Sequence, residues 1–250
     1  MVENKRFKDK LAGKIRYPED INSKRTIAAR VVRSEISHGI IKGIHIPPVP
    51  EEITLLSAKD IPGVNKITVP GGFVPLLGDK KVRYIGEAIL LAAGPDEEEL
   101  DNFLNTIKIE YEILEKLGIP ASSDDFVSSR MIVKGTPEEA ISQSWQVFES
   151  YFSTPSQEHM ATPLLSAYVK NEGQKFIINS TTQWPTNIIQ NISAVLGVSK
   201  DNITLRTNPS GKSLDSKIWM PSVVAAQAAL LSQKSKKPVR LIYSAREDFL

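Results

Sequence analysis

The chain has 250 residues but contains no cysteine and only three histidines, which are His38, His45 and His159. Without a thiol group it forms no disulfide and holds no iron–sulfur cluster or zinc ion through cysteine. The histidines lie apart from any cluster of metal-ligating residues in the sequence, so we predict that this chain ligates no metal itself. Any redox centre used by the protein therefore has to be a bound cofactor or belong to a partner.

The sequence also lacks a long apolar run and an excess of charge of one sign. No stretch approaches the roughly 18 apolar residues that cross a bilayer, and the first ten residues carry no apolar core of a secretory signal. The 31 basic and 29 acidic side chains nearly cancel, without a long basic stripe. We therefore predict a cytoplasmic protein that binds neither membrane nor nucleic acid, and we interpret basic residues 234–237 as a solvated helix end.

What the sequence does contain is the composition of an ordinary folded protein, with 41% hydrophobic and 24% charged residues. In the first half, residues 26–46 alternate and then run apolar around a break at His38 and Gly39, which predicts a β-hairpin. The apolar run 88–93 predicts a strand, residues 95–106 predict a helix whose first turn carries carboxylates, and residues 107–113 predict a half-buried strand. The first half is thus a mixed α and β unit.

The polar, turn-forming residues 120–125 predict a linker between two domains. Beyond it we expect helices at 136–144, 185–196 and 221–232, and strands at 147–153, 164–169, 176–180, 203–206 and 239–243. Gly197 suits the C-terminal end of the second of these helices. Helices that alternate with strands are typical of layered αβ domains.

Several short strings, spread along the chain in a matching order and spacing, resemble the large subunit of the molybdenum hydroxylases, the xanthine dehydrogenase and aldehyde oxidase family. In the first half they are KLAGKIRYPEDI at residues 10–21, LLGDKKVRYIGE at 76–87 and IEYE at 109–112. In the second half they are GTPEEA at 135–140, TPSQEH at 154–159 and TTQWP at 181–185. Together they cover nearly the whole chain.

The resemblance implies an α+β fold, with an α/β-hammerhead domain at residues 1–119 and the N-terminal part of a layered αβ molybdopterin-binding domain at residues 126–250. It also implies an oxidoreductase that hydroxylates aldehydes or N-heterocycles with molybdopterin, the molybdenum cofactor. The family's large subunit is much longer and holds its general-base carboxylate in a part that is absent here. We therefore expect the isolated chain to be inactive and to need a complementary molybdopterin-subunit chain, with iron–sulfur and flavin groups on partner subunits.

The same resemblance points to five cofactor-binding residues. Gln183 matches a family glutamine that lies beside an oxo or sulfido ligand of molybdenum. The string GKSLDSK at residues 211–217 takes the place of a run of glycines around one phenylalanine that ends in lysine. In this string the implied cofactor-binding residues are Gly211, Ser213, Leu214 and Lys217. No residue of this chain is predicted to be catalytic.

Glycine allows a backbone to approach a ligand and to take positive φ, so replacing glycines with larger residues has a physical consequence. We expect four side chains of the string to crowd and repel a phosphate-bearing pterin. These side chains belong to Lys212, Ser213, Asp215 and Ser216.

Two further differences from the family bear on function. Ile218 stands where purine-oxidising relatives carry a glutamate that holds the substrate ring, so we do not expect xanthine as a substrate. Thr162 stands in place of a glutamate before Pro163. These replacements favour a second hypothesis, in which the chain is a cofactor-free scaffold or binding protein that kept the fold.

A third hypothesis, a nucleotide-binding protein, rests on Gly211, Lys212 and Ser213, which match the tail of a phosphate-binding P-loop. The complete motif requires a glycine where this chain has Arg206.

Overall fold

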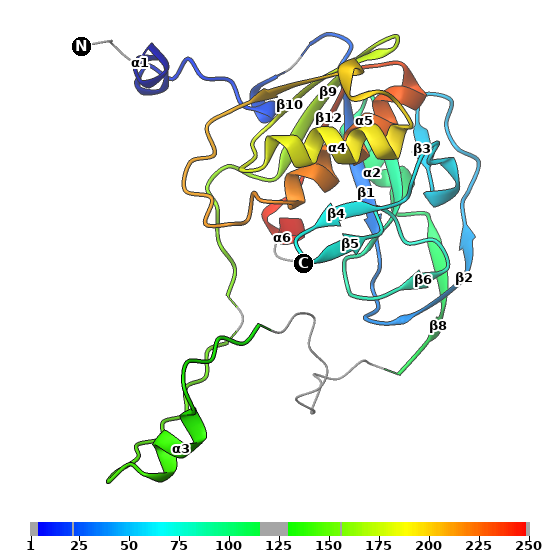
Figure 1. Cartoon of the computed structure of the whole chain (residues 1–250). Coiled ribbons are helices and arrows are strands. Elements are labelled where there is room, and N and C mark those ends of the chain that lie inside the picture. Colours follow the sequence, from blue (N-terminus) through cyan, green and yellow to red (C-terminus); the bar gives the residue numbers. More distant parts are fainter. Residues whose placement is uncertain (1–4, 22, 116–129, 156, 249–250) are drawn as a thin grey trace. The chain divides into compact units, whose positions relative to one another are not determined.

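The computed structural model describes residues 5–21, 23–115, 130–155 and 157–248 (Figure 1). The chain divides into two compact units, Met1–Leu117 with His159–Leu250, and Gly118–Glu158. The predicted linker at residues 120–125 lies outside the described residues. The division of the chain into domains at residues 119 and 126 therefore stays a prediction.

The larger unit is built on one seven-stranded sheet with strand order β11-β10-β9-β12-β1-β7-β3. Strands from the first hundred residues and strands from the last ninety lie in the same sheet, as Figure 1 shows. The strands are β1 (Ile27–Arg33), β3 (Thr54–Leu56), β7 (Ala88–Gly94), β9 (Ser166–Glu172), β10 (Lys175–Ser180), β11 (Ile203–Thr207) and β12 (Val239–Ile242).

The two parts of the sequence meet where β1 pairs with β12 in parallel, with Ile27 opposite Val239 and Ala29 opposite Leu241. On its other side β1 pairs antiparallel with β7. Strand β7 is buried along its whole length, which explains why its sequence is continuously apolar and not alternating. The sheet is therefore continuous across the junction.

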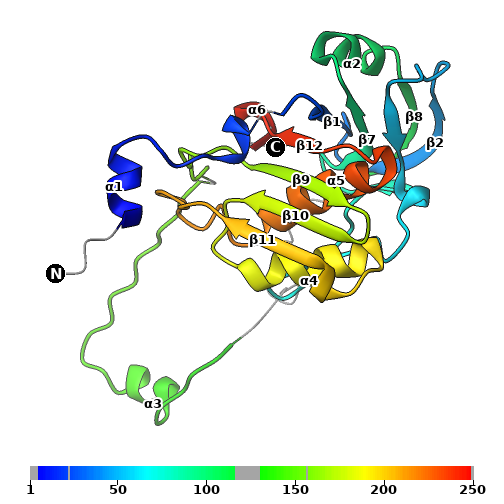
Figure 2. The same cartoon turned by 90° about the horizontal axis from the view of Figure 1, so that it is seen from above.

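Two helices form a layer on the strands from the second half of the chain, seen from above in Figure 2. Helix α5 (Met220–Ser235) packs on β9 and β12, and α4 (Pro185–Leu196) packs on α5 and β11. Most residues of α5 are buried, and many of them are alanines with small side chains. Helix α4 ends as predicted, because Gly197 takes the left-handed conformation with φ of 65°.

Helix α4 also receives a segment from the first half of the chain. The backbone N–H groups of Gly63 and Val64 donate to the last carbonyls of α4, those of Val195 and Ala194, at 3.0 Å each. A Cβ added to Gly63 would lie 2.0 Å from the Ala194 carbonyl oxygen, so only glycine fits here. One turn further back, Asn191 accepts a hydrogen bond from the backbone N–H of Thr68 at 2.7 Å.

Two small sheets complete the larger unit. One has the order β6-β2-β8, formed by β6 (Lys81–Val82), β2 (Gly39–His45) and β8 (Lys108–Ile113), and the other pairs β4 (Ile67–Val69) with β5 (Gly72–Val74). The predicted hairpin at residues 26–46 is wrong, because β1 and β2 belong to different sheets and find their partners far along the chain.

The smaller unit contains α3 (Pro137–Ser142), close to the predicted helix at 136–144. The predicted strand at 147–153 is wrong, since all of these residues are described and none lies in a helix or strand. The large apolar side chains of residues 147–153 are exposed, and Tyr151 is 92% exposed. The described residues of the unit contain no other strand for this segment to pair with.

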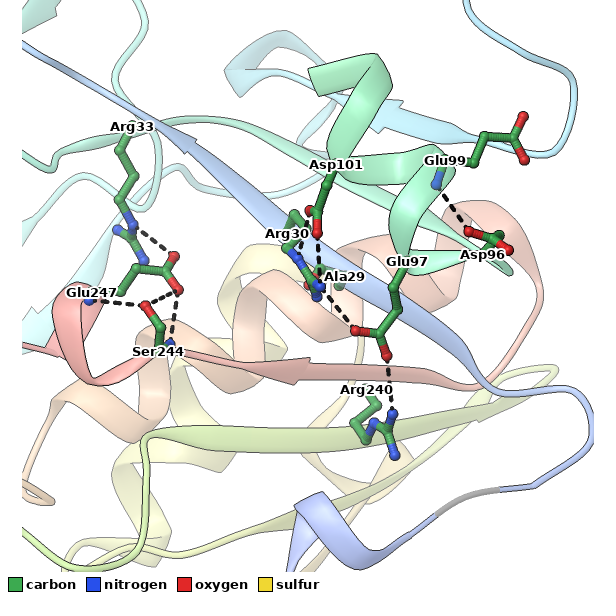
Figure 3. Close-up of polar contacts among 10 residues, drawn as sticks. All are labelled: Ala29, Arg30, Arg33, Asp96, Glu97, Glu99, Asp101, Arg240, Ser244 and Glu247. Atoms are coloured by element: carbon green, nitrogen blue, oxygen red, sulfur yellow. Dashed lines mark hydrogen bonds and ion pairs between the residues drawn. The ribbon is translucent and has the colours of Figure 1, made fainter. Parts of the chain in front are cut away.

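Charged side chains cross the junction between the two parts of the sheet (Figure 3). On β1, the guanidinium of Arg30 donates to Asp101 at 2.8 Å and to Glu97 at 2.9 Å, both on α2 (Glu97–Leu104). The second oxygen of Glu97 lies 3.4 Å from the guanidinium of Arg240 on β12. Glu97 thus connects one strand from each part of the sequence. Because these groups are partly exposed, we expect each pair to stabilise the fold by at most about 1 kcal/mol.

The shared sheet predicts that the two parts of the sequence unfold together. Leu241 on β12 is 1% exposed and lies in the main core with Ala29 and Leu91. Leu241→Ala is expected to lower the free energy of unfolding by about 2–5 kcal/mol in urea denaturation, because it leaves a cavity. Hydrogen exchange should then report an equal loss of protection in β7 and β12.

The matched control is Thr204→Ala, an exposed position on the edge strand β11, which should change stability by about 0.5 kcal/mol or less. If Leu241→Ala accelerates exchange only within residues 166–242, the two parts fold independently and the expectation fails.

Candidate functional site

The site begins at the edge of the sheet where two neighbouring parallel strands end. Strands β10 and β11 are paired from Phe176 opposite Ile203 to Ser180 opposite Thr207, so their carboxyl ends lie side by side. Gln183 follows the first strand by three residues, and the loop at 208–219 follows the second. In open α/β sheets, ligands bind at such carboxyl ends.

The two strings singled out in the sequence are in direct contact. The backbone N–H of Gln183 donates to the carbonyl of Lys217 at 2.8 Å. The Thr182 hydroxyl lies 3.5 Å from the same carbonyl and accepts a hydrogen bond from the Trp184 N–H at 2.9 Å. The loop is thus hydrogen-bonded to the segment after β10 through the backbone carbonyl of Lys217.

Within the loop, the backbone takes conformations that favour glycine, although most of its residues are larger. Gly211, Leu214 and Asp215 have φ of 61°, 47° and 72°. At Gly211 an added Cβ would also lie 3.4 Å from the Pro163 ring. The turn is closed by Ser216, whose N–H and hydroxyl both donate to the Ser213 carbonyl, at 3.0 and 2.7 Å.

The side chains of this loop divide into an inner and an outer set. Ser213, Ser216 and Lys217 are buried, whereas Lys212, Leu214 and Asp215 are exposed, as are Gly211 and Gln183. The structure therefore brings all five predicted site residues to one edge of the sheet. Of the four residues predicted to crowd a pterin, the two serines lie inward and the two charged residues lie outward, and their effect on a pterin stays a prediction.

Lys217 is the most unusual residue of the loop. It is 0% exposed, and its Nζ has no hydrogen-bond partner within the described residues. Burial lowers the pKa of this ammonium, and the negative charges of Asp248 and Glu19 only partly oppose that effect. A buried cation without a hydrogen-bond partner is unfavourable, so the position is suited to an anionic ligand atom.

Other polar groups near this end of the sheet were not predicted from the sequence. Glu19, in the 3₁₀ turn η1 (Pro18–Asp20), accepts a hydrogen bond from the Ser166 hydroxyl at 2.9 Å through Oε1. Its Oε2 is buried and has no partner among the described residues, and the same is true of the Thr181 hydroxyl. No local pattern marks Glu19, because turn η1 reaches β9 and β12 only through the tertiary fold.

The sequence predicted that no side chain of this chain ligates a metal ion. In the described part of the chain, no group of three or more histidine, cysteine, aspartate or glutamate residues is placed to hold a metal ion. The ring of His38 lies 2.6 Å from the Glu115 carbonyl through Nδ1, and that of His45 lies 3.0 Å from Glu110. None of the described helices is long and apolar enough to cross a bilayer.

The P-loop hypothesis requires a helix that begins at the motif itself. Here α5 begins at Met220, seven residues after Ser213, and an irregular turn lies between them. The geometry of Gly211, Lys212 and Ser213 is therefore not that of a P-loop.

Two family models match this chain. Residues 12–115 match the aldehyde oxidase and xanthine dehydrogenase a/b hammerhead domain, and residues 122–250 match the molybdopterin cofactor-binding domain. Among curated relatives, a probable xanthine dehydrogenase subunit of Bacillus subtilis is 25% identical over 96% of this chain, and aldehyde oxidase 4 of Cavia porcellus is 24% identical over 81%. The chain spans 34% and 15% of the lengths of these two proteins.

Solved structures share the fold. The quinoline 2-oxidoreductase of Pseudomonas putida 86 superposes on the whole chain with a TM-score of 0.82 at 20% identity, over 35% of its own length. The aldehyde oxidoreductase of Desulfovibrio gigas superposes on 96% of the chain with a TM-score of 0.75 at 24% identity, over 29% of its length. The predicted α+β architecture is thereby confirmed.

The buried ammonium predicts a measurable dependence of stability on pH. Because the pKa of Lys217 is lowered in the folded state, the folded chain releases this proton before the unfolded chain does as pH rises. The free energy of unfolding of the wild type should therefore rise, relative to Lys217→Met, as pH increases toward about 10.4, the ordinary lysine pKa. Urea denaturation of both proteins across that range measures the difference.

The control is Lys200→Met at an exposed position, which should follow the wild type at every pH. Parallel stability curves for wild type and Lys217→Met would show that Lys217 titrates as an ordinary exposed lysine, contrary to expectation.

Proposed function

Because the chain belongs to the aldehyde oxidase and xanthine dehydrogenase family, we propose that it forms part of the molybdopterin-binding site of a multi-subunit oxidoreductase that hydroxylates aldehydes or N-heterocycles. In this proposal residues 1–119 form the hammerhead domain and residues 126–250 form the N-terminal part of the molybdopterin-binding domain. A complementary molybdopterin-subunit chain and subunits with iron–sulfur and flavin groups complete the assembly. The cytoplasmic location stays a prediction.

One observation carries the proposal. The ammonium of Lys217 is buried without a hydrogen-bond partner in the described structure, at the base of a loop attached to the Gln183 backbone. A cation in this state is best satisfied by an anionic group from outside the chain, and molybdopterin carries a phosphate. The residues present therefore fit the cofactor in charge.

Each predicted site residue has a role that follows from its position. Lys217 would hold an anionic group of the cofactor, and the exposed amide of Gln183 would donate and accept hydrogen bonds. The backbone at Gly211 and Leu214 has positive φ, and its peptide groups would contact the ligand, as would the buried Ser213. When bound, the cofactor supplies the redox-active metal.

The substrate class follows from the residue after the loop. Ile218 is half-buried and aliphatic, so it offers no carboxylate to hold a purine ring. We propose an aldehyde or an N-heterocycle as the substrate, and we do not expect xanthine to be one.

Cofactor content tests the proposal directly. The chain is purified from cells that make the molybdenum cofactor, co-expressed with its genomic neighbours, and molybdenum and pterin are measured per chain. Wild type should retain pterin. Lys217→Met should retain at least about tenfold less pterin per chain, because the anionic group loses its buried cation. Lys200→Gln, which changes an exposed lysine outside the loop, should retain wild-type levels.

A second candidate function is a cofactor-free scaffold, which the exposed Asp215 carboxylate and the Lys212 side chain at the loop favour. It requires that wild type and both variants contain no pterin and no molybdenum while remaining folded, and that result would end the first proposal.

Asp215 offers a gain-of-binding test. Asp215→Gly removes an anion next to the proposed phosphate position and suits the observed φ of 72°. Pterin retention should rise relative to wild type, measured by fluorescence of the released pterin. Asp201→Gly, an exposed aspartate before β11, is the matched change and should have no effect; equal retention in all three proteins would show that Asp215 does not oppose binding.

A further inference from the structure

A groove of about 550 Å³ lies on the larger unit, away from the loop at 208–219. It is lined by the segment before β1, the end of β9 and the segment before β12. Its cationic residues are Lys24, Arg25, Lys170, Lys236 and Lys237, and its lining contains no carboxylate.

Strand topology explains why these cations meet. Because β1 and β12 run parallel, their amino ends lie at the same edge of the sheet, and the basic pairs at 24–25 and 236–237 directly precede them. Strand β9 runs antiparallel to β12, so its carboxyl end brings Lys170 to the same edge. Three segments far apart in the sequence therefore contribute to one charged surface.

Most of this charge has no counter-charge among the described residues. Within the described residues, Lys170 has an ion pair with Glu172 at 2.5 Å, but Lys24, Arg25, Lys236 and Lys237 have none. The negative end of helix α5 accounts for the two lysines that follow it but not for Lys24 and Arg25, which come from another segment. Like charges held together without partners raise the local potential and attract an anion.

The remaining lining limits the kind of anion. Ile27, Pro95 and Pro238 give the groove an apolar wall, and the side-chain oxygen of Asn171 has no hydrogen-bond partner in the described part of the chain. The volume is that of a small-molecule site. Single exposed lysines bind a single charge weakly, so the ligand has to engage several of them at once.

We propose that this groove binds a small molecule that carries a diphosphate group. The diphosphate contacts the basic pairs before β1 and β12, and an organic part attached to it lies against the two prolines. The site is separate from the proposed cofactor loop and does not depend on it.

Isothermal titration with ADP, inorganic pyrophosphate and adenosine tests the proposal on the full chain. ADP and pyrophosphate should bind saturably, with affinity falling as salt rises from about 50 to about 200 mM, and adenosine should bind much more weakly. The double variant Lys24→Gln with Lys237→Gln removes one cation from each basic pair. It should weaken ADP binding by about tenfold, since each exposed cation contributes modestly.

Lys80→Gln with Lys200→Gln is the matched control, because both lysines are exposed and lie outside the groove lining and the cofactor loop; it should bind ADP as the wild type does. Thermal unfolding of both double variants should match the wild type, which separates binding from folding. The proposal is overturned if ADP does not bind up to about 10 mM. It is equally overturned if the groove variant binds ADP normally, if adenosine binds as tightly as ADP, or if only an acidic peptide binds.

Discussion

The parallel pairing of β1 with β12 is the constraint on which the rest of the larger unit depends. Three opposed residue pairs, from Ile27 with Val239 to Ala29 with Leu241, join the region that matches the hammerhead model to the region that matches the molybdopterin-binding model. The side chains of the first and third pairs belong to one hydrophobic core that also includes Leu91 and Ile188. Each region buries apolar surface against the other. A substitution in the core of either region is therefore expected to destabilise both.

Two parallel pairings determine what lies at two edges of the sheet, and the pairing of β1 with β12 is one of them. It brings the basic pairs before β1 and β12 together at one edge, where they form the groove. At another place in the sheet, the parallel pairing of β10 with β11 brings Gln183 and the loop closed by Lys217 together. Each surface is thus assembled from segments that the sheet, and not local sequence, makes neighbours.

Local sequence patterns predicted what depends on near neighbours and missed what depends on distant ones. The strand at 88–93 and the helix at 185–196 with Gly197 were predicted correctly. A strand buried on both faces and a helix C-terminus each leave a signal within a few consecutive residues. The hairpin at 26–46 was wrong, because the choice of partner strand depends on residues 88–94 and 239–241. Contact between Gln183 and the loop was implied by family resemblance, whereas the burial of Lys217 and its proximity to Glu19 depend on how η1 packs on β9 and β12.

The loop keeps a glycine-like backbone even though Leu214 and Asp215 occupy it. A left-handed conformation costs a residue such as leucine about 1–2 kcal/mol, and less for aspartate, so contacts elsewhere must hold the turn in place. Those contacts are the two hydrogen bonds from Ser216 to the Ser213 carbonyl and the bond from Gln183 to Lys217. They involve backbone atoms and one buried hydroxyl, none of which requires glycine. The turn is therefore held without glycine at Leu214 and Asp215, and the exposed side chains of these two residues set the space and charge at its outer face.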